Sequence, residues 1–156
     1  MQSNHARFVI PVDGGRGDER VLELVKQIAV HQQLSITMLY VVEVPQSMPL
    51  DAELPDEIAR GDDVLRAAES RARAVAGKGN EVVSELLQAR AAGAAIVDEA
   101  IDRHADMIVM SATNRRQHGR TTVGDTVEYV MRNAPCEVLI ARLATANADN
   151  GIGQWA

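Results

Sequence analysis

Two patterns of apolar residues follow each other along the chain: short apolar runs, and stretches in which apolar residues recur at a fixed spacing. Five short, mostly apolar runs lie at residues 6–13, 34–44, 80–89, 105–112 and 136–143. Runs of this length and composition are typical of strands buried on both faces of a sheet. For the third run the alternative stays open, because "SELLQARAA" also has good helix propensity. The stretches between the runs repeat apolar residues every three or four positions, which predicts amphipathic helices.

Four helices are expected. The first follows Asp18, whose side chain is expected to cap it. The second covers residues 57–75, after a segment that three prolines keep irregular. The third is centred on residues 96–101, and the last begins near Gly124 and ends at Asn133, before Pro135. The residues expected to face the core are Val21, Leu24, Val25, Ile28, Val64, Leu65, Ala68, Ala72, Val75, Ile96, Val97, Ala100, Ile101, Val123, Val127, Val130, Met131 and Ala134.

The alternation of strands and helices predicts the fold class. Short connections between strand and helix are typical of βαβ units, whose parallel strands are covered by helices on both faces. We therefore expect an α/β fold with one doubly wound, five-stranded parallel sheet. Residues 1–143 are expected to form a single domain, and residues 144–156, which lack periodicity, a mobile tail.

Composition and charge narrow the possible functions. The chain has 156 residues, a single cysteine and a net charge of −6. A single cysteine suits a reducing compartment, so a cytoplasmic location is expected. The negative charge disfavours nucleic-acid binding, and no apolar run is long enough to insert into a membrane. Cys136 is expected to be a small buried packing residue, with a reactive thiol as the alternative.

Candidate chemistry lies at the ends of the predicted strands. In an open parallel sheet, ligands bind beyond the carboxyl ends of the strands, where the strand order reverses. Asp13 follows the first strand, and Val41 lies near the end of the second. The fourth strand leads through Ser111 and a basic loop, residues 115–120, to the helix beginning near Gly124. A helix start can bind an anion, so this layout indicates a phosphate loop; a solvated loop is the alternative.

Motifs of common enzymes and metal sites are missing from the sequence. There is no Walker pattern, no G-x-G-x-x-G after the first strand and no G-x-S-x-G elbow. The four histidines lack the spacing of metal ligands, and Asp98 with Asp102 reads as a solvated helix face. We expect neither a catalytic nor a metal site.

Three segments carry a resemblance to a known family. "FVIPVDGG", "ADMIVMSATN" and "VGDTVEYVMRNAPCEVLIAR" resemble the universal stress protein family, and the resemblance covers about residues 6–142. It implies the strand order 3-2-1-4-5. It also implies a homodimer formed through the last strand, and an apolar edge strand favours such pairing on physical grounds. The implied interface residues are Glu137, Val138, Leu139, Ile140 and Ala141. The implied nucleotide-binding residues are Pro11, Asp13, Val41, Met110, Ser111, Thr113, Asn114, Gly124, Asp125 and Thr126.

The chain departs from the family's phosphate-loop pattern. Nucleotide-binding members read G-x-x-G, nine residues, then G-[ST]; the matching positions here are Ser111, Asn114, Gly124 and Asp125, of which only Gly124 agrees. Ser111 is expected to add a side chain where phosphate would contact backbone. Asp125 replaces a hydroxyl donor by a carboxylate. Like charges about 4 Å apart repel by about 4 kcal/mol near a protein surface, about a thousandfold in affinity. Asp125 could alternatively be a stabilising first-turn helix residue.

Two functions follow as hypotheses. The first is a dimeric regulatory, stress-response module with an altered adenine-nucleotide pocket. It would take AMP, a cyclic nucleotide or, weakly, ATP; no cofactor is certain. The alternative is a dimeric interaction domain that binds no nucleotide. Such a domain could have a regulatory protein or a transporter as partner, or be a companion or tail of that transporter.

Overall fold

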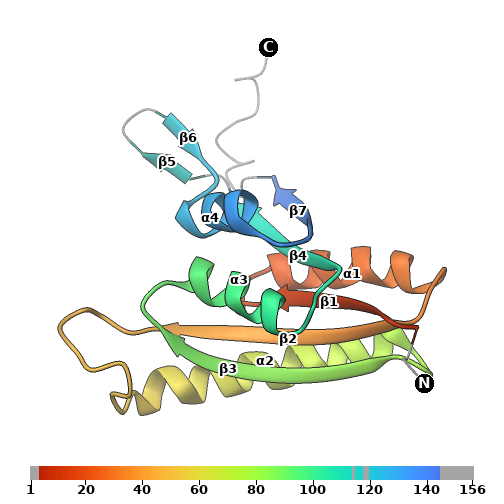
Figure 1. The fold of residues 1–156 in the computed structure, drawn as a ribbon, viewed down its shortest axis with the longest axis horizontal. Helices are drawn as coiled ribbons and strands as arrows, with labels where there is room; N and C mark the ends of the chain where they lie inside the picture. Colours follow the sequence, from red (N-terminus) through yellow and green to blue (C-terminus); the bar gives the residue numbers. More distant parts are fainter. Residues whose placement is uncertain (1–3, 114, 118–119, 145–156) are drawn as a thin grey trace.

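The five predicted strands form one parallel sheet. The computed structural model describes residues 4–113, 115–117 and 120–144, and the strand order is β3-β2-β1-β4-β7, which confirms the predicted 3-2-1-4-5 topology (Figure 1). The third run is a strand rather than a helix. The strands are β1 (Ala6–Pro11), β2 (Leu34–Glu43), β3 (Glu81–Ala89), β4 (Met107–Thr113) and β7 (Glu137–Leu143).

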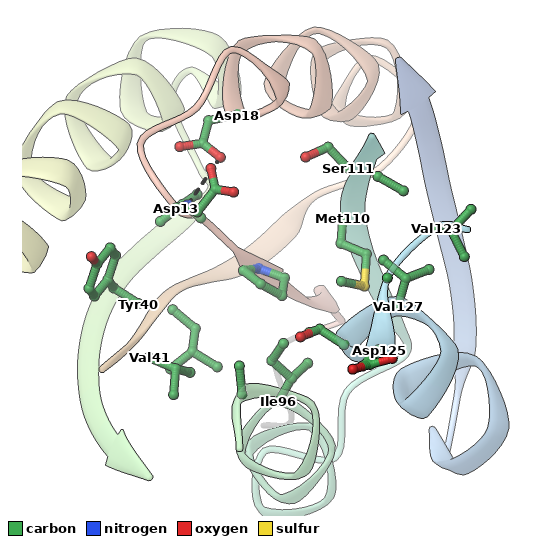
Figure 2. A pocket seen from close by; sticks show the side chains of 17 residues that line it. Asp13, Asp18, Tyr40, Val41, Ile96, Met110, Ser111, Val123, Asp125 and Val127 are labelled. Carbon is green, nitrogen blue, oxygen red and sulfur yellow. Dashed lines mark hydrogen bonds between the residues drawn. The ribbon is translucent and has the colours of Figure 1, made fainter. Parts of the chain in front are cut away.

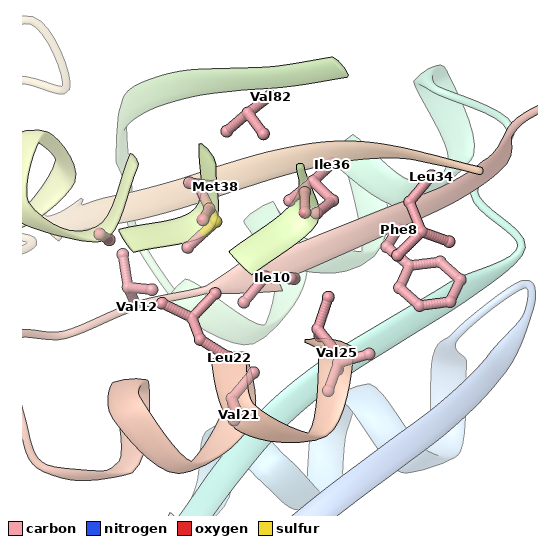
Figure 3. Packing of buried hydrophobic residues seen from close by; sticks show 14 of the residues in the cluster. Phe8, Ile10, Val12, Val21, Leu22, Val25, Leu34, Ile36, Met38 and Val82 are labelled. Atoms are coloured by element: carbon pink, nitrogen blue, oxygen red, sulfur yellow. The ribbon is translucent and has the colours of Figure 1, made fainter. Parts of the chain in front are cut away.

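Two layers of helix cover the sheet and bury two apolar cores. One core lies between the sheet and helices α1 (Gly17–Ala29) and α2 (Pro55–Ala76). Figure 3 shows Phe8 and Ile10 of β1 in this core with Val21 and Val25 of α1. The other core lies under α3 (Ala92–Asp102) and α4 (Asp125–Asn133). The α/β class with helices on both faces is therefore confirmed.

Two helix starts differ from the sequence prediction. Helix α2 begins at Pro55, two residues before the predicted start, inside the segment interpreted as a loop. Proline suits the first helical position, since its missing N–H has no partner there. Asp18 was expected to cap α1, but Arg16 occupies the N-cap position and Asp18 lies in the first turn of the helix. Its carboxylate accepts hydrogen bonds from the preceding loop instead.

The core-facing sides of the helices are narrower than predicted. Ile101 and Met131 are 51% and 60% exposed, so neither belongs to the core. Both lie in short helices, α3 and α4, which also pack against each other rather than only on the sheet. Leu24 and Val75 are half-buried, and their neighbours Leu22 and Ala76 are buried instead.

Cys136 is half-buried rather than buried, and it borders the core under α3 and α4. Burial raises the pKa of its thiol. Because the thiolate is the nucleophilic form, the raised pKa favours the packing role over the reactive thiol.

A short two-stranded sheet interrupts the predicted basic loop. β5 (Arg115–Gln117) and β6 (Arg120–Thr122) pair antiparallel, and Figure 1 shows them projecting past α4. The sequence predicted a basic loop here without these two strands, whose backbone pairs Arg115 with Thr122 and Arg116 with Thr121. Asn114 and the predicted tail beyond residue 144 lie outside the described residues.

Strand β7 ends the five-strand order, as the predicted dimer edge requires. Its side chains reach both cores: Leu139 and Ala141 pack on the α1 and α2 side, Val138 and Ile140 on the other. They are half-buried, and Glu137 is exposed. Within the described ranges, every helix is too short or too polar to cross a bilayer.

Candidate functional site

A cavity of about 270 Å³ opens at the carboxyl ends of the central strands. It lies where β1 and β4 separate: β1 leads through α1 to β2 on one side, while β4 leads towards β7 on the other. Ligands of open parallel sheets usually bind at the point where the strand order reverses in this way. The described lining residues are Pro11, Val12, Asp13, Asp18, Leu39, Tyr40, Val41, Ala92, Ile96, Met110, Ser111, Ala112, Val123, Gly124, Asp125, Thr126 and Val127 (Figure 2).

Most of the residues that sequence reasoning singled out come together in this cavity. Thr113 ends β4, but its side chain, like the whole of Asn114, lies outside the described part of the chain. The predicted residues that line the cavity are Pro11, Asp13, Val41, Met110, Ser111, Gly124, Asp125 and Thr126.

Sequence reasoning missed Leu39 of β2, Asp18 of α1 and the wall that comes from α3. Leu39 and Val41 lie on the same face of β2, and alternation along the strand could have identified Leu39. Ala92 and Ile96 stand one helical turn apart in α3. A Cβ at Gly93 would lie 2.9 Å from the Cβ of Tyr129, so this glycine permits the close approach of α3 and α4 that joins two walls of the cavity.

Two carboxylates shape the loop between β1 and α1. Asp13 Oδ1 accepts a hydrogen bond from the Gly15 N–H at 2.7 Å. The Asp18 carboxylate accepts from the Gly14 N–H at 2.8 Å and from the Asp13 N–H at 3.3 Å. Gly14 has φ of +85°, a conformation that disfavours side chains. Figure 2 shows the two carboxyl groups side by side on one side of the cavity.

The pKa of Asp18 reflects this crowding. Burial raises the pKa of its carboxyl above the ordinary value of 3.8, and the neighbouring Asp13 charge acts in the same direction. The two amide bonds and Arg71 lower the pKa, but not enough to reverse the shift. Asp18 therefore holds the loop although burial disfavours the ionised form of its carboxyl.

Ser111 does not intrude on the cavity in the way that was expected. Its side chain is directed at α1, where a Cβ on Gly17 would lie only 2.2 Å from the Ser111 Oγ. Gly17 thus leaves the space that the serine side chain fills. Ser111 lines the cavity while its side chain packs against the start of α1.

Gly124 and Asp125 form the start of α4. Gly124 is the N-cap residue, with φ of +93°, which explains a glycine at this position. Asp125 is the first helical residue, and its exposed carboxylate lies at the positive end of the helix. This position suits a stabilising first-turn role for Asp125. Figure 2 shows that the same side chain also faces the cavity, opposite Asp13 and Asp18.

A further carboxylate lies at the start of α3. Glu43, the last residue of β2, accepts a hydrogen bond from the Ala92 N–H at 3.1 Å. Ala92 is the first residue of α3 and lines the cavity. Across the described residues, no three His, Cys, Asp or Glu side chains are grouped so that they could hold a metal ion.

Comparisons with known proteins agree with one another. A family model described as the universal stress protein family matches residues 5–142. A universal stress protein of Methanocaldococcus jannaschii is 28% identical over 144 residues, covering 88% of this chain and 82% of that protein.

Solved structures are similar over almost the same range. A universal stress protein from Archaeoglobus fulgidus in complex with dAMP has a TM-score of 0.68 and 21% identity, covering 88% of this chain and 98% of its own. A universal stress protein in complex with cAMP has a TM-score of 0.66 and 21% identity, covering 91% and 100%. At this identity the structures establish a shared fold.

Proposed function

We propose that this chain, which belongs to the universal stress protein family, is a regulatory module whose cavity binds an adenine-containing ligand. The observation that carries the proposal is the cavity at the point where the strand order reverses, between the ends of β1 and β4. The dAMP and cAMP complexes of structural neighbours support the ligand class.

The walls of the cavity suit a nucleoside. Val41, Ile96 and Met110 supply apolar surface from three elements, against which a planar base can pack. Asp13 lies in the loop just after β1, where a carboxylate can accept hydrogen bonds from an exocyclic amine or from ribose hydroxyls. A few polar groups in an otherwise apolar cleft are the usual composition of a small-molecule site.

The ligand we expect is smaller than ATP. The cavity volume of about 270 Å³ lies near the lower limit of about 300 Å³ for small-molecule pockets. Asp125 stands at the start of α4, where terminal phosphates would otherwise meet the helix. AMP or a cyclic nucleotide therefore fits better than ATP, which we expect to bind weakly. The role is binding rather than catalysis.

The module is proposed to act as a homodimer through β7, with Glu137 to Ala141 in the interface. The position of β7 at the end of the strand order supports this pairing. A regulatory protein or a transporter is the proposed downstream partner, and the single cysteine suits the cytoplasm. The competing function is a dimeric interaction domain that leaves the cavity without nucleotide.

Isothermal titration calorimetry on the purified chain separates these functions. We expect heat of binding with AMP or cyclic AMP at up to millimolar ligand, and weaker binding of ATP. If none of the adenine ligands binds at millimolar concentration, the cavity does not serve nucleotides and the interaction domain is the better description.

A further inference from the structure

We infer that the cavity selects against charge, so that the uncharged nucleoside adenosine binds more tightly than its phosphorylated forms. The inference deepens the proposed function and rests on it, because it assumes a ligand that carries adenine. The observation behind it is that a carboxylate lies at the start of each of the three helices that begin at the cavity: Asp18 and Asp125 are in first turns, and Glu43 of β2 bonds the first amide of the third helix. These helices are α1, α3 and α4.

The start of α1 is occupied by Asp18, whose carboxylate takes the N–H groups of Asp13 and Gly14. These amides lie in the loop that follows β1, where a phosphate would otherwise find backbone donors. The Gly15 N–H is taken as well, by Asp13 Oδ1. An anion approaching this loop would meet two carboxylates and the amides that they already hold.

A carboxylate also offsets the positive potential at the start of α3. The Ala92 N–H donates to Glu43 Oε1 at 3.1 Å, so the first amide of the helix is already bonded to an anion. At α4 the carboxylate is that of Asp125, the first helical residue, which faces the cavity from the side opposite Asp13 and Asp18 (Figure 2). The positive potential of a helix start, which usually attracts phosphate, is offset at all three sites.

Cationic side chains do not restore the balance among the described lining residues, which include three carboxylates and no lysine, arginine or histidine. Two arginines near the start of α1 are bonded to groups outside the lining, although the charge of Arg71 also acts on Asp18. Arg16 donates to the Ala144 carbonyl oxygen at 2.6 Å, and Arg71 forms an ion pair with Glu19 at 2.6 Å. Repulsion from the lining carboxylates would lower the affinity of a phosphorylated ligand, whereas a neutral nucleoside would keep the contacts of its base and ribose.

The test is calorimetry with adenosine, cyclic AMP, AMP and ATP at two salt concentrations. We expect affinity to fall in that order, with adenosine at least about tenfold tighter than AMP at low salt. Because salt screens repulsion, AMP should bind more tightly in about 0.5 M NaCl than in about 20 mM, while adenosine should change little. Loss of a packing contact would not produce this salt response.

A pair of variants assigns the effect to the cavity. Asp125→Asn removes one facing charge and should narrow the ratio between adenosine and AMP affinities. Glu128→Gln removes an equal charge from the same first turn of α4, outside the lining, and should leave the ratio nearly unchanged.

The titrations distinguish a failure of the charge inference from a failure of the proposed function. If AMP binds more tightly than adenosine and loses affinity as salt rises, cations dominate the site: the charge inference is overturned and the proposed function stands. If no adenine compound binds, the proposed function fails and the inference with it.

Discussion

Ser111 at the end of β4 and Gly17 at the start of α1 fit against each other so closely that position 17 cannot hold a Cβ without displacement. An added Cβ would lie 2.2 Å from the Ser111 Oγ and 2.5 Å from the Ser111 Cβ. Two positions 94 residues apart in the chain (111 minus 17) are therefore coupled at the rim of the cavity. The serine that departs from the family's glycine is accommodated by a glycine in the neighbouring helix.

Replacing Gly17 by alanine should destabilise the protein by about 1–3 kcal/mol, the usual cost of overpacking. The opposite sign is expected from helix propensity alone, which favours alanine by about 1 kcal/mol. Adding Ser111→Gly should recover most of the loss, because the nearest remaining atom is Leu143 Cδ1, at 3.4 Å. Urea denaturation of both single variants and the double variant measures this coupling. A Gly17→Ala protein more stable than the parent would refute the close packing.

The Asp18 carboxyl should make stability depend on pH in a definite direction. Its pKa is raised in the folded state, mainly by burial, so the folded protein holds this proton more tightly than the unfolded chain does. Stability should therefore fall as pH rises from about 3.8, the ordinary value, through the raised pKa, and this contribution should then stay constant. The charged side chains that change the pKa of Asp18 are Asp13, which raises it, and Arg71, which lowers it. Arg71 is itself paired with Glu19.

The Asp18→Asn variant isolates this contribution. Relative to the variant, the parent should lose free energy of unfolding across that acidic interval, as measured by urea denaturation at several pH values. A difference between the two proteins that does not vary with pH would show that Asp18 titrates alike in both states.

Restoring the family's loop chemistry should strengthen ATP binding. The double variant Asn114→Gly, Asp125→Ser replaces a carboxylate by a hydroxyl donor and returns a glycine to the loop. We expect at least a tenfold gain in ATP affinity by calorimetry, since repulsion from Asp125 is removed. Glu128→Ser with Asn114→Gly is the matched control, because it removes a charge outside the cavity lining. If the double variant binds ATP no better than the control, Asp125 is not the obstacle.

A charge on β7 should dissociate the proposed dimer. Leu139→Lys places an ammonium group in the predicted interface, and sedimentation should show a monomer. Leu139 also packs against the α1 and α2 core, so circular dichroism must confirm that the variant is folded. Leu139→Ala removes similar packing without adding charge and should remain dimeric. A folded lysine variant that still sediments as a dimer would place the interface elsewhere.

The fold could be predicted from the sequence because each strand and helix has a recognisable local pattern of apolar residues. The strand of residues 34–43 is mostly apolar and rich in β-branched residues, and buried positions such as Val21 and Val25 recur at the helical period. Boundaries were harder to predict: Pro55 reads as a breaker, yet it is the residue that begins α2. The paired strands β5 and β6 were missed because each has only three residues.

The site was predicted where it depends on strand ends and missed where it depends on tertiary placement. Asp13 and Ser111 follow apolar runs, so their position at the carboxyl edge could be inferred. Ile96 lines the cavity only because α3 begins at Ala92, close to the start of α4. The role of Asp18 depends on the left-handed backbone of Gly14, which folds the loop back over the carboxylate. No periodicity in the sequence carries that information.

The most direct test of the cavity as the ligand site is calorimetric titration of AMP into a variant whose cavity is filled. Val41 points into the cavity from β2 (Figure 2), so Val41→Trp should obstruct it. Val83→Trp is the control, because Val83 lies on β3, is 44% exposed and stands outside the cavity lining. We expect AMP to bind the parent and Val83→Trp alike and to lose at least tenfold in affinity for a folded Val41→Trp protein. Equal AMP affinity in all three would contradict the assignment of the cavity as the binding site.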